Sequence, residues 1–356
     1  MNPLIPTPDT IPVAWGWFEF LLLLTLPLHL ICMNMLLGSA GISLYARLRG
    51  DESDRRLSYE LARLLPFLVA FTVNFGVAPL LFNQVLYGQF LYVSSVLMAS
   101  YWLPVVPLLI FAYYAIYLYD FRFRSLGGFA APFLAMALLT LVGIAFIFTN
   151  NMSLALDPSH WQAYFGTADG SLLNWSEPTL IPRFLHFVVG GFAVGGLAVA
   201  FIGRFWGKRD ALVGEKAIGY GMRLFFALTV IQLALGGWFV VSLPREIMML
   251  FMGQSLLATI LFSGGLLLSL VVLVTAWQRR VGLTTLLTIL LVVVMSVLRD
   301  LARIAYHEPF FKAEQLEVIP HYSPMILFFV SLVLGLAIIV WMLRQALTLP
   351  PAKEHE

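Results

Sequence analysis

The chain has 356 residues, of which 60% are apolar and only 11% are charged, and its mean hydropathy is +0.89. A composition this apolar excludes a soluble globular domain, and a net charge of +2 gives no indication of nucleic acid or another strongly charged partner. The one cysteine, Cys32, excludes a disulfide framework and any paired-cysteine motif for a metal or covalent cofactor. The sequence therefore predicts an all-α, polytopic membrane protein.

The apolar runs predict nine membrane-spanning helices, because each run is long enough to cross a bilayer core. These runs cover residues 17–45, 60–83, 97–119, 128–149, 183–203, 219–242, 254–276, 283–304 and 323–343. Residues 1–15 contain several prolines but no basic residue, so they do not read as a cleaved signal and the first helix is expected to be retained. We therefore predict a single integral membrane domain over residues 1–356.

Basic residues predict the orientation of these helices. Sixteen of the 21 Lys and Arg residues fall on one side of the predicted membrane. By the positive-inside rule this side faces the cytoplasm, so the N-terminus is expected outside and the C-terminus inside. The outer side then carries two longer loops, 150–182 and 305–322, and no large loop between the sixth and seventh helices. These acidic, aromatic loops are either solvated connections at the membrane interface or a docking face for an extracytoplasmic partner.

Two histidines lie inside apolar runs at the same predicted depth. His29 is 18 residues before Arg47 and His186 is 18 residues before Arg204, which is about 27 Å along a helix. In a bilayer core roughly 30 Å thick, both imidazoles should lie near the outer face. Each is either a satisfied polar residue inside the bundle or a functional group, and imidazole is a common axial ligand of haem iron. The leading hypothesis is a haem-bearing membrane protein.

Glycines follow His186 on the same predicted helix. Gly190 comes one turn after His186, and Gly191 and Gly195 are one turn apart. Glycines on one helix face let either a flat macrocycle or another helix approach the backbone closely. We therefore predict Gly190 and Gly191 as cofactor-binding residues, with helix packing as the alternative.

Three arginines near the outer face are candidates for binding the anionic propionates of a haem. Arg183 precedes His186 by three residues, and Arg299 and Arg303 are four residues apart on one helix face with Asp300 beside them. Guanidinium groups bind carboxylates strongly, which favours this role. The alternative is a buried ion cluster that ties helices together, because charges inside a membrane must be paired.

The segment from Phe184 to Arg209, with its F-x-H-x-x-x-x-G-F-x-x-G core and basic exit, resembles helix 5 of the cytochrome bd quinol oxidase subunit I family. Further segments resemble that family in the same order: Leu26 to His29, Asn74 to Val77, Gln84 to Gly88, and Asp120. The resemblance covers mainly residues 17–230. It implies haem b ligated by His186, a second haem ligated by His29, quinol as substrate, a second membrane subunit and a bacterial-type plasma membrane.

The chain departs from that family where oxygen is reduced. On this alignment the family's helix-3 carboxylates fall at about Ser100 and Leu108, the helix-2 glutamate is Gln84, and the helix-8 glutamate that ligates a high-spin haem falls near Ile304. Oxygen reduction needs protons delivered to a buried site, and a path without titratable groups does not supply them easily. The departures therefore argue against oxygen reduction.

The family's quinol loop and its methionine ligand also lack clear counterparts. The loop between the sixth and seventh helices is reduced to about residues 244–253, and residues 254–277 contain no methionine. Met248, Met249 and Met252 lie just before that helix, and we predict Met252 as a metal ligand, with simple packing as the alternative. His307 and His321 are expected in solvent-exposed positions.

These patterns predict a haem b-binding membrane electron-transfer subunit, with one or two haems, that passes electrons between quinol and an extracytoplasmic redox partner such as a cytochrome. Membrane lipid surrounds it, and no nucleic acid is expected. Two alternatives remain open: a reduced form of a terminal quinol oxidase subunit, and a haem-free transporter or membrane anchor subunit.

Overall fold

Nine helices of the computed structural model are long and apolar enough to cross a membrane, counted over the described residues 4–166 and 168–348. The spanning elements are α1 (Trp15–Arg49), α2 (Glu52–Leu97), α3 (Ala99–Trp102) with α4 (Val105–Phe121), α5 (Ala130–Leu156), α6 (Leu180–Trp206), α7 (Ala211–Ser242), α9 (Leu256–Trp277), α10 (Val281–His307) and α11 (Tyr322–Thr348). The short elements are η1 (Gly127–Phe129), η2 (Pro158–Gly166), α8 (Arg245–Met249), η3 (Leu250–Gln254) and η4 (Ala313–Gln315). The predicted all-α membrane fold with nine spanning helices is confirmed.

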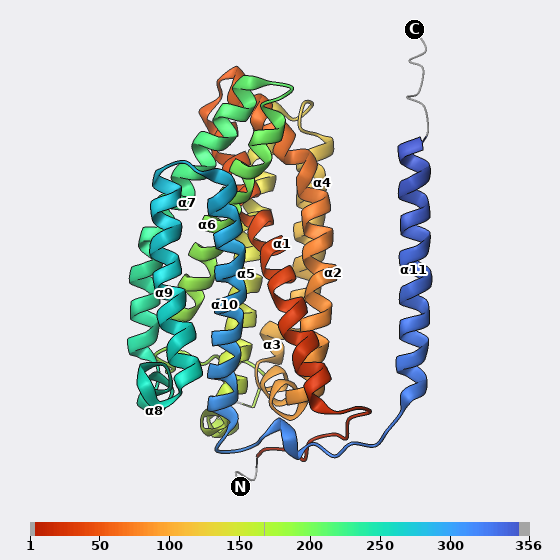
Figure 1. Ribbon diagram of the computed structural model, residues 1–356, viewed down its shortest axis with the longest axis vertical. Coiled ribbons are helices and arrows are strands. Elements are labelled where there is room, and N and C mark those ends of the chain that lie inside the picture. Colours follow the sequence, from red (N-terminus) through yellow and green to blue (C-terminus); the bar gives the residue numbers. More distant parts are fainter. Residues whose placement is uncertain (1–3, 167, 349–356) are drawn as a thin grey trace.

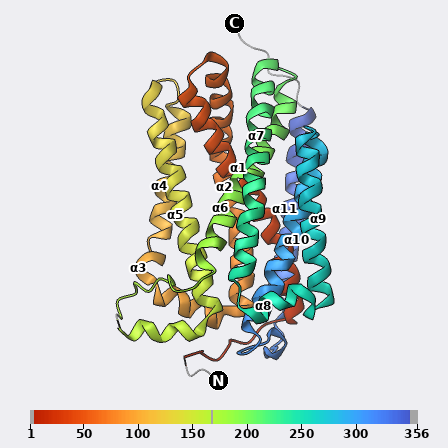
Figure 2. The same ribbon diagram turned by 90° about the vertical axis from the view of Figure 1, so that its left-hand side faces the viewer.

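The spanning helices lie side by side along one axis (Figures 1 and 2). At one end, called here the N-terminal end, α1 and α6 begin and α2, α5 and α10 finish. The segment before α1 crosses this end and is held by Ile11, whose backbone N–H donates to the Glu317 carbonyl at 2.9 Å. The Ile319 N–H donates in turn to the Ile11 carbonyl at 3.0 Å. This segment, residues 4–14, is called here the strap. It lies beside the last turns of α2 and α10.

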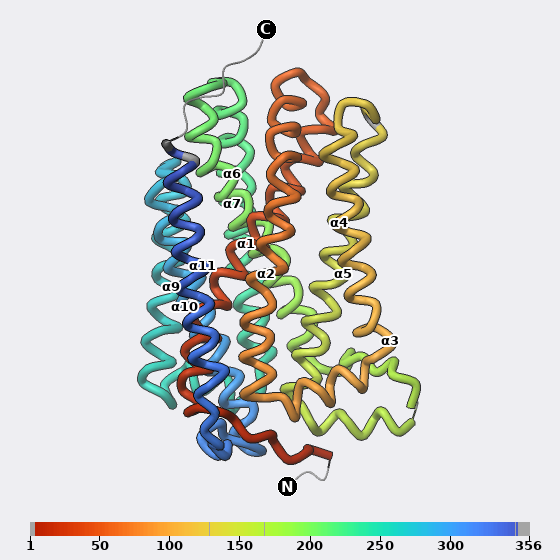
Figure 3. The backbone as a smooth tube through the Cα atoms, turned by 90° about the vertical axis from the view of Figure 1, so that its right-hand side faces the viewer, coloured from red at the N-terminus to blue at the C-terminus, as the bar shows by residue number. Residues whose placement is uncertain are grey.

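Helix α11 stands apart from the other helices (Figure 1). The connection from α10 runs along the N-terminal end before α11 begins (Figure 3). None of the apolar window of α11 is buried inside the protein. A helix that is apolar on all sides suits a lipid environment or contact with another membrane subunit.

Helix α2 is much longer than the predicted span 60–83. It begins after Asp51, whose side chain accepts a hydrogen bond from the Asp54 N–H at 2.8 Å, which satisfies an N-terminal donor. It continues to Leu97 past a kink at Tyr87, where φ is −133° and ψ is 30°. The predicted helix 97–119 is broken instead, since α3 and α4 are separated by Leu103 and Pro104.

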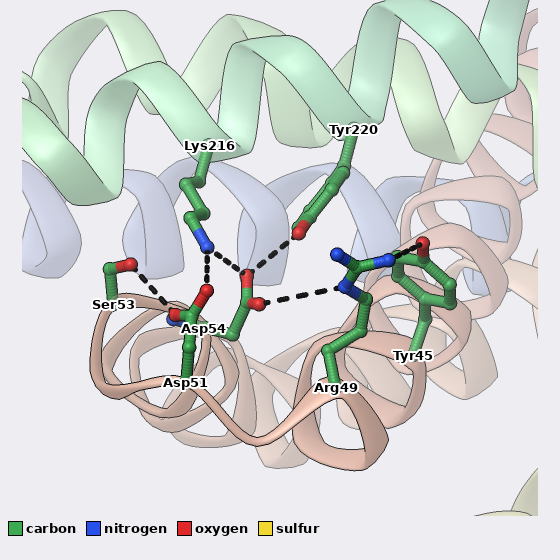
Figure 4. A network of polar contacts seen from close by, with 7 residues as sticks. All are labelled: Tyr45, Arg49, Asp51, Ser53, Asp54, Lys216 and Tyr220. Atoms are coloured by element: carbon green, nitrogen blue, oxygen red, sulfur yellow. Dashed lines mark hydrogen bonds and ion pairs between the residues drawn. The ribbon is translucent and has the colours of Figure 1, made fainter.

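A network of charged groups ties the α1–α2 turn to α7 at the end opposite the N-terminal end (Figure 4). Lys216 Nζ lies 2.6 Å from Asp51 Oδ2 and 2.9 Å from Asp54 Oδ1, and the Tyr220 hydroxyl donates to Asp54 Oδ1 at 2.8 Å. The Lys216 ammonium holds the pKa of the Asp51 carboxyl well below its usual range. Because the Asp54 side chain is fully buried, Lys216 compensates a carboxylate that water does not reach.

We expect Lys216→Met to destabilise the protein by about 2 kcal/mol, because the buried Asp54 carboxylate loses a charge-assisted hydrogen bond. Thermal unfolding in detergent should show a Tm lower by about 5 °C. Lys208→Met is the matched control, since Lys208 is exposed at the same end of the bundle and takes no part in this network. Equal Tm values for the two variants would show that the network does not stabilise the fold.

Candidate functional site

His186 lies in the second turn of α6 and faces α7. Its ring is stacked on Phe239, with ring centres 6.3 Å apart and an angle of 27° between the planes. A Cβ added to Gly236 would lie 3.3 Å from His186 Cε1, so α7 approaches this ring closely. The Nδ1 atom is buried and has no hydrogen-bond partner among the described residues. A buried nitrogen without a protein partner is suited to bind a group from outside the chain.

His29 lies in the middle of α1 and faces α2. Its Nδ1 is 2.9 Å from the Thr72 carbonyl oxygen, a contact that assigns the ring proton to Nδ1. Nε2 is then left with its lone pair, the arrangement that metal-binding histidines adopt. A Cβ added to Gly76 would lie 2.8 Å from the ring, so only a glycine at this position allows α2 to pack this closely against His29. His29 therefore contacts α2, whereas His186 contacts α7.

Two arginines, the buried Arg183 beside His186 and the half-buried Arg299, have no carboxylate within ion-pair distance in the described part of the chain. Arg183, 9% exposed, donates from Nη2 to Thr179 Oγ1 at 3.2 Å, and its guanidinium carbon lies 5.4 Å from the centre of the Phe239 ring. Phe239 therefore contacts both Arg183 and His186. Arg299 lies on α10, which packs against α6, the helix that carries Arg183. Uncompensated cations inside a membrane protein suit an anionic ligand.

Arg303, in contrast, is bound to acids of the protein. Its Nη2 donates to Glu19 Oε1 at 2.8 Å and also to Asp300 Oδ1, and its Nη1 donates to Asn83 Oδ1 at 3.0 Å. The guanidinium carbon lies 4.4 Å from the centre of the Tyr87 ring. These partners come from α1, α2 and α10, so Arg303 forms the buried ion cluster that ties three helices together. Its geometry does not support the predicted role in binding a cofactor.

The glycines of α6 pack helices against one another. A Cβ at Gly191 would meet the side chains of α1 at 3.1 Å, and one at Gly195 would lie 2.6 Å from the Gly38 backbone. A Cβ at Gly190 would lie 2.9 Å from Nε2 of Gln232, which donates to the His186 carbonyl at 2.8 Å. The predicted open face for a macrocycle at Gly190 and Gly191 is therefore filled by α1 and by Gln232, as the helix-packing alternative requires.

Met252, the predicted metal ligand, lies in the short segment between α8 and α9. It belongs to η3, is 50% exposed, and no contact in the described residues joins it to His186. Met248 packs instead in the apolar cluster that contains Phe239 and Leu298. Met248 therefore packs against the same cluster as Phe239, the residue that stacks on His186.

The prediction that His307 is exposed is wrong. Its side chain is 2% exposed, and its ring lies 4.2 Å from the Phe90 ring centre and 5.0 Å from that of Tyr87. The reason is that α10 continues to His307 instead of stopping at residue 304, so the histidine is carried under the strap before α1. His321 is exposed, as predicted.

A trio of metal-binding residue types, missed in the sequence, lies in the connection between α5 and α6. One ligand atom each of Asp157, His160 and Glu177 lies within 4.8 Å of the others. His160 Nδ1 is paired with Asp157 Oδ2 at 2.6 Å, and Glu177 Oε1 accepts from the Thr179 hydroxyl at 2.7 Å. These local contacts account for the trio, which orders the loop that precedes α6 and positions Thr179 beneath Arg183.

No family model matches the sequence, and no curated protein matches it. A match exists among solved structures: a chain of the bd oxidase from Geobacillus thermodenitrificans aligns with a TM-score of 0.66 and 14% identity, over 97% of this chain and 100% of that chain. At this identity the likeness establishes the fold. The helices are therefore arranged as in a bd oxidase, which supports the resemblance seen in the sequence at the level of architecture.

Proposed function

We propose that this chain is a haem b-binding membrane electron-transfer subunit, related to bd-type quinol oxidases, that passes electrons between quinol and an extracytoplasmic redox partner. The observation that carries the proposal is the buried Nδ1 of His186, which has no partner among the described residues and lies near Arg183, a buried arginine without a carboxylate partner among them. The bd oxidase arrangement of the helices supports it.

The residues present fit a haem b held without covalent attachment. His186 would supply an imidazole ligand, and Arg183 and Arg299 would bind the anionic propionates. His29, with its Nδ1 fixed by the Thr72 carbonyl, would serve a second haem through Nε2. Bound haem iron supplies one-electron transfer between its ferric and ferrous states.

The protein side chains set the conditions for that chemistry. Thr179 and Phe239 hold Arg183 in place, so its charge stays close to His186. Positive charge near a redox centre favours its reduced state, and burial strengthens the effect because water screens it less. Arg183 and Arg299 are therefore expected both to bind the cofactor and to raise its potential.

We further propose that the N-terminal end of the bundle faces outward from a bacterial-type plasma membrane. The opposite end carries most of the basic residues, as the positive-inside rule requires of a cytoplasmic face. An extracytoplasmic cytochrome would then meet the loops beside His186. The exposed helix α11 provides a surface for a second membrane subunit.

The reduced-minus-oxidised absorption spectrum of the purified protein tests this function. Wild type should show a b-type band, and His186→Ala should lose the part of it that comes from the haem held by His186, because that ligand is removed. A haem held by His29 would keep its own part of the band. His321→Ala is the matched control, since His321 is exposed at the same end, and its band should be unchanged. A colourless wild type would contradict the proposal and leave transport or anchoring, whereas quinol-driven oxygen consumption would favour a terminal oxidase.

A further inference from the structure

A polar pocket lies at the N-terminal end, between the strap before α1 and the part of α2 around its kink. Its volume is about 280 Å³, close to the lower end for small-molecule sites. Thr7 and Asp9 line it from the strap. Gln84, Gln89 and Tyr92 line it from α2.

These five polar side chains are free of hydrogen-bond partners within the described part of the chain. None of them takes part in a hydrogen bond with any residue that the structure describes. Gln89 is only 8% exposed, and its Nε2 is buried without an acceptor. Leaving a buried donor unpaired costs about 1–3 kcal/mol, so the pocket is built for a bonding group that the chain itself does not provide.

The pocket opens toward the side of α2 that faces lipid. Val85 and Tyr92, on its rim, are 36% and 53% exposed, and both stand on a membrane-spanning helix. These apolar and aromatic rim residues can contact an apolar part of a ligand, so a ligand with a polar head and an apolar tail fits the pocket. Its polar part must satisfy amide, hydroxyl and carboxylate groups together.

We propose that this pocket binds the oxygen-bearing ring of a quinone or quinol, with the isoprenoid tail in lipid. The N–H groups of Gln84 and Gln89 and the Tyr92 hydroxyl match the carbonyl oxygens of a quinone. The Asp9 carboxylate and the two amide oxygens match the hydroxyls of a quinol. This inference rests on the proposed function, for which it names the site that takes the membrane substrate.

Gly88 lines the pocket and leaves room for the Tyr92 ring. A Cβ added there would lie 3.1 Å from the Tyr92 ring, which is tighter than an ordinary contact. Glycine thus lets the Tyr92 ring lie against α2 beside the two glutamines. Gly88→Ala would displace the Tyr92 ring from this position.

Calorimetric titration of the full-length protein in detergent with decyl-ubiquinone, a short-tailed benzoquinone, tests the site. Gln89→Leu should weaken binding about tenfold, because it removes a desolvated donor, and Tyr92→Phe about threefold, because only a hydroxyl is lost. Tyr92→Phe changes no volume and should fold normally. Asn74→Leu is the matched control on α2, since the Asn74 amide donates to the Ala70 carbonyl of its own helix at 2.9 Å. It should bind like wild type.

Absence of decyl-ubiquinone binding, or wild-type affinity in both pocket variants, would overturn the inference. Equal competition by a short-chain phosphatidylcholine would overturn it too, because the pocket would then hold a lipid ester. The haem spectrum separates this outcome from the fate of the proposed function. A b-type band without quinone binding contradicts the pocket alone, and quinone binding by a colourless protein contradicts electron transfer alone.

Discussion

Arg303→Met should destabilise the protein by about 3–5 kcal/mol, because two buried carboxylates lose their common cation. Glu19 is 9% exposed and Asp300 is 5% exposed, so water replaces little of what Arg303 provides. The substitution also releases Asn83 and thereby loosens α1, α2 and α10 from one another. Thermal unfolding in detergent measures the effect, and a Tm equal to that of wild type would show that the cluster does not hold these helices.

A combined variant separates the charges from the contacts that they make. Glu19→Gln and Asp300→Asn, added to Arg303→Met, remove every charge of the cluster while keeping its approximate volume. Because the largest cost of breaking a buried pair comes from the charge left behind, the triple variant should regain much of the lost stability. A triple variant less stable than Arg303→Met alone would contradict this account.

The spanning segments were predictable because apolar length is local information. Each of the nine predicted runs corresponds to a spanning element, with α3 and α4 together forming the third. The extents were not predictable. Helix α2 continues to Leu97 because its last turns pack under the strap before α1, where Phe90 meets His307 and Trp161. No pattern within α2 predicts the contacts of Phe90 with residues so distant in sequence.

The roles of the arginines could not be predicted from the sequence, because they depend on partners that are far away along the chain. Arg303 is bound to Asn83 and Glu19, which lie 220 and 284 residues away. One signal in the sequence did point to Glu19: it is the single acid of the predicted helix 17–45, and charges inside a membrane seek partners. The choice between Arg299 and Arg303 as its partner needed the arrangement of α1, α2 and α10.

For the histidines, too, one property was predictable from the sequence and another was not. Their positions within spanning helices were predictable from the apolar flanks, and both side chains are half-buried. The direction of each ring was not predictable, since His29 faces α2 and His186 faces α7. The glycine pattern of α6 was equally ambiguous between a ligand and a helix. Gly195 resolves it, because the Gly38 backbone occupies the space where a macrocycle would need to lie.

Arg299→Met should have opposite consequences for haem-free and haem-loaded protein. Arg299 is half-buried, has no carboxylate within ion-pair distance in the described residues and lies one turn from Arg303, so its charge destabilises the haem-free state. Its replacement should stabilise that state by about 1–2 kcal/mol. In the loaded protein the lost positive charge should weaken haem binding and lower the midpoint potential by roughly 40 mV for each kcal/mol of lost attraction.

Thermal unfolding of the haem-depleted protein measures the expected gain in stability. A redox titration of the haem-loaded protein measures the expected fall in midpoint potential. Arg245→Met, exposed at the same end of the bundle, should change neither. A residue that only supports the fold cannot stabilise one state and destabilise the other, because its contacts are the same in both. If Arg299→Met lowers the Tm of the haem-depleted protein, Arg299 is a structural residue and the anionic ligand must be bound elsewhere.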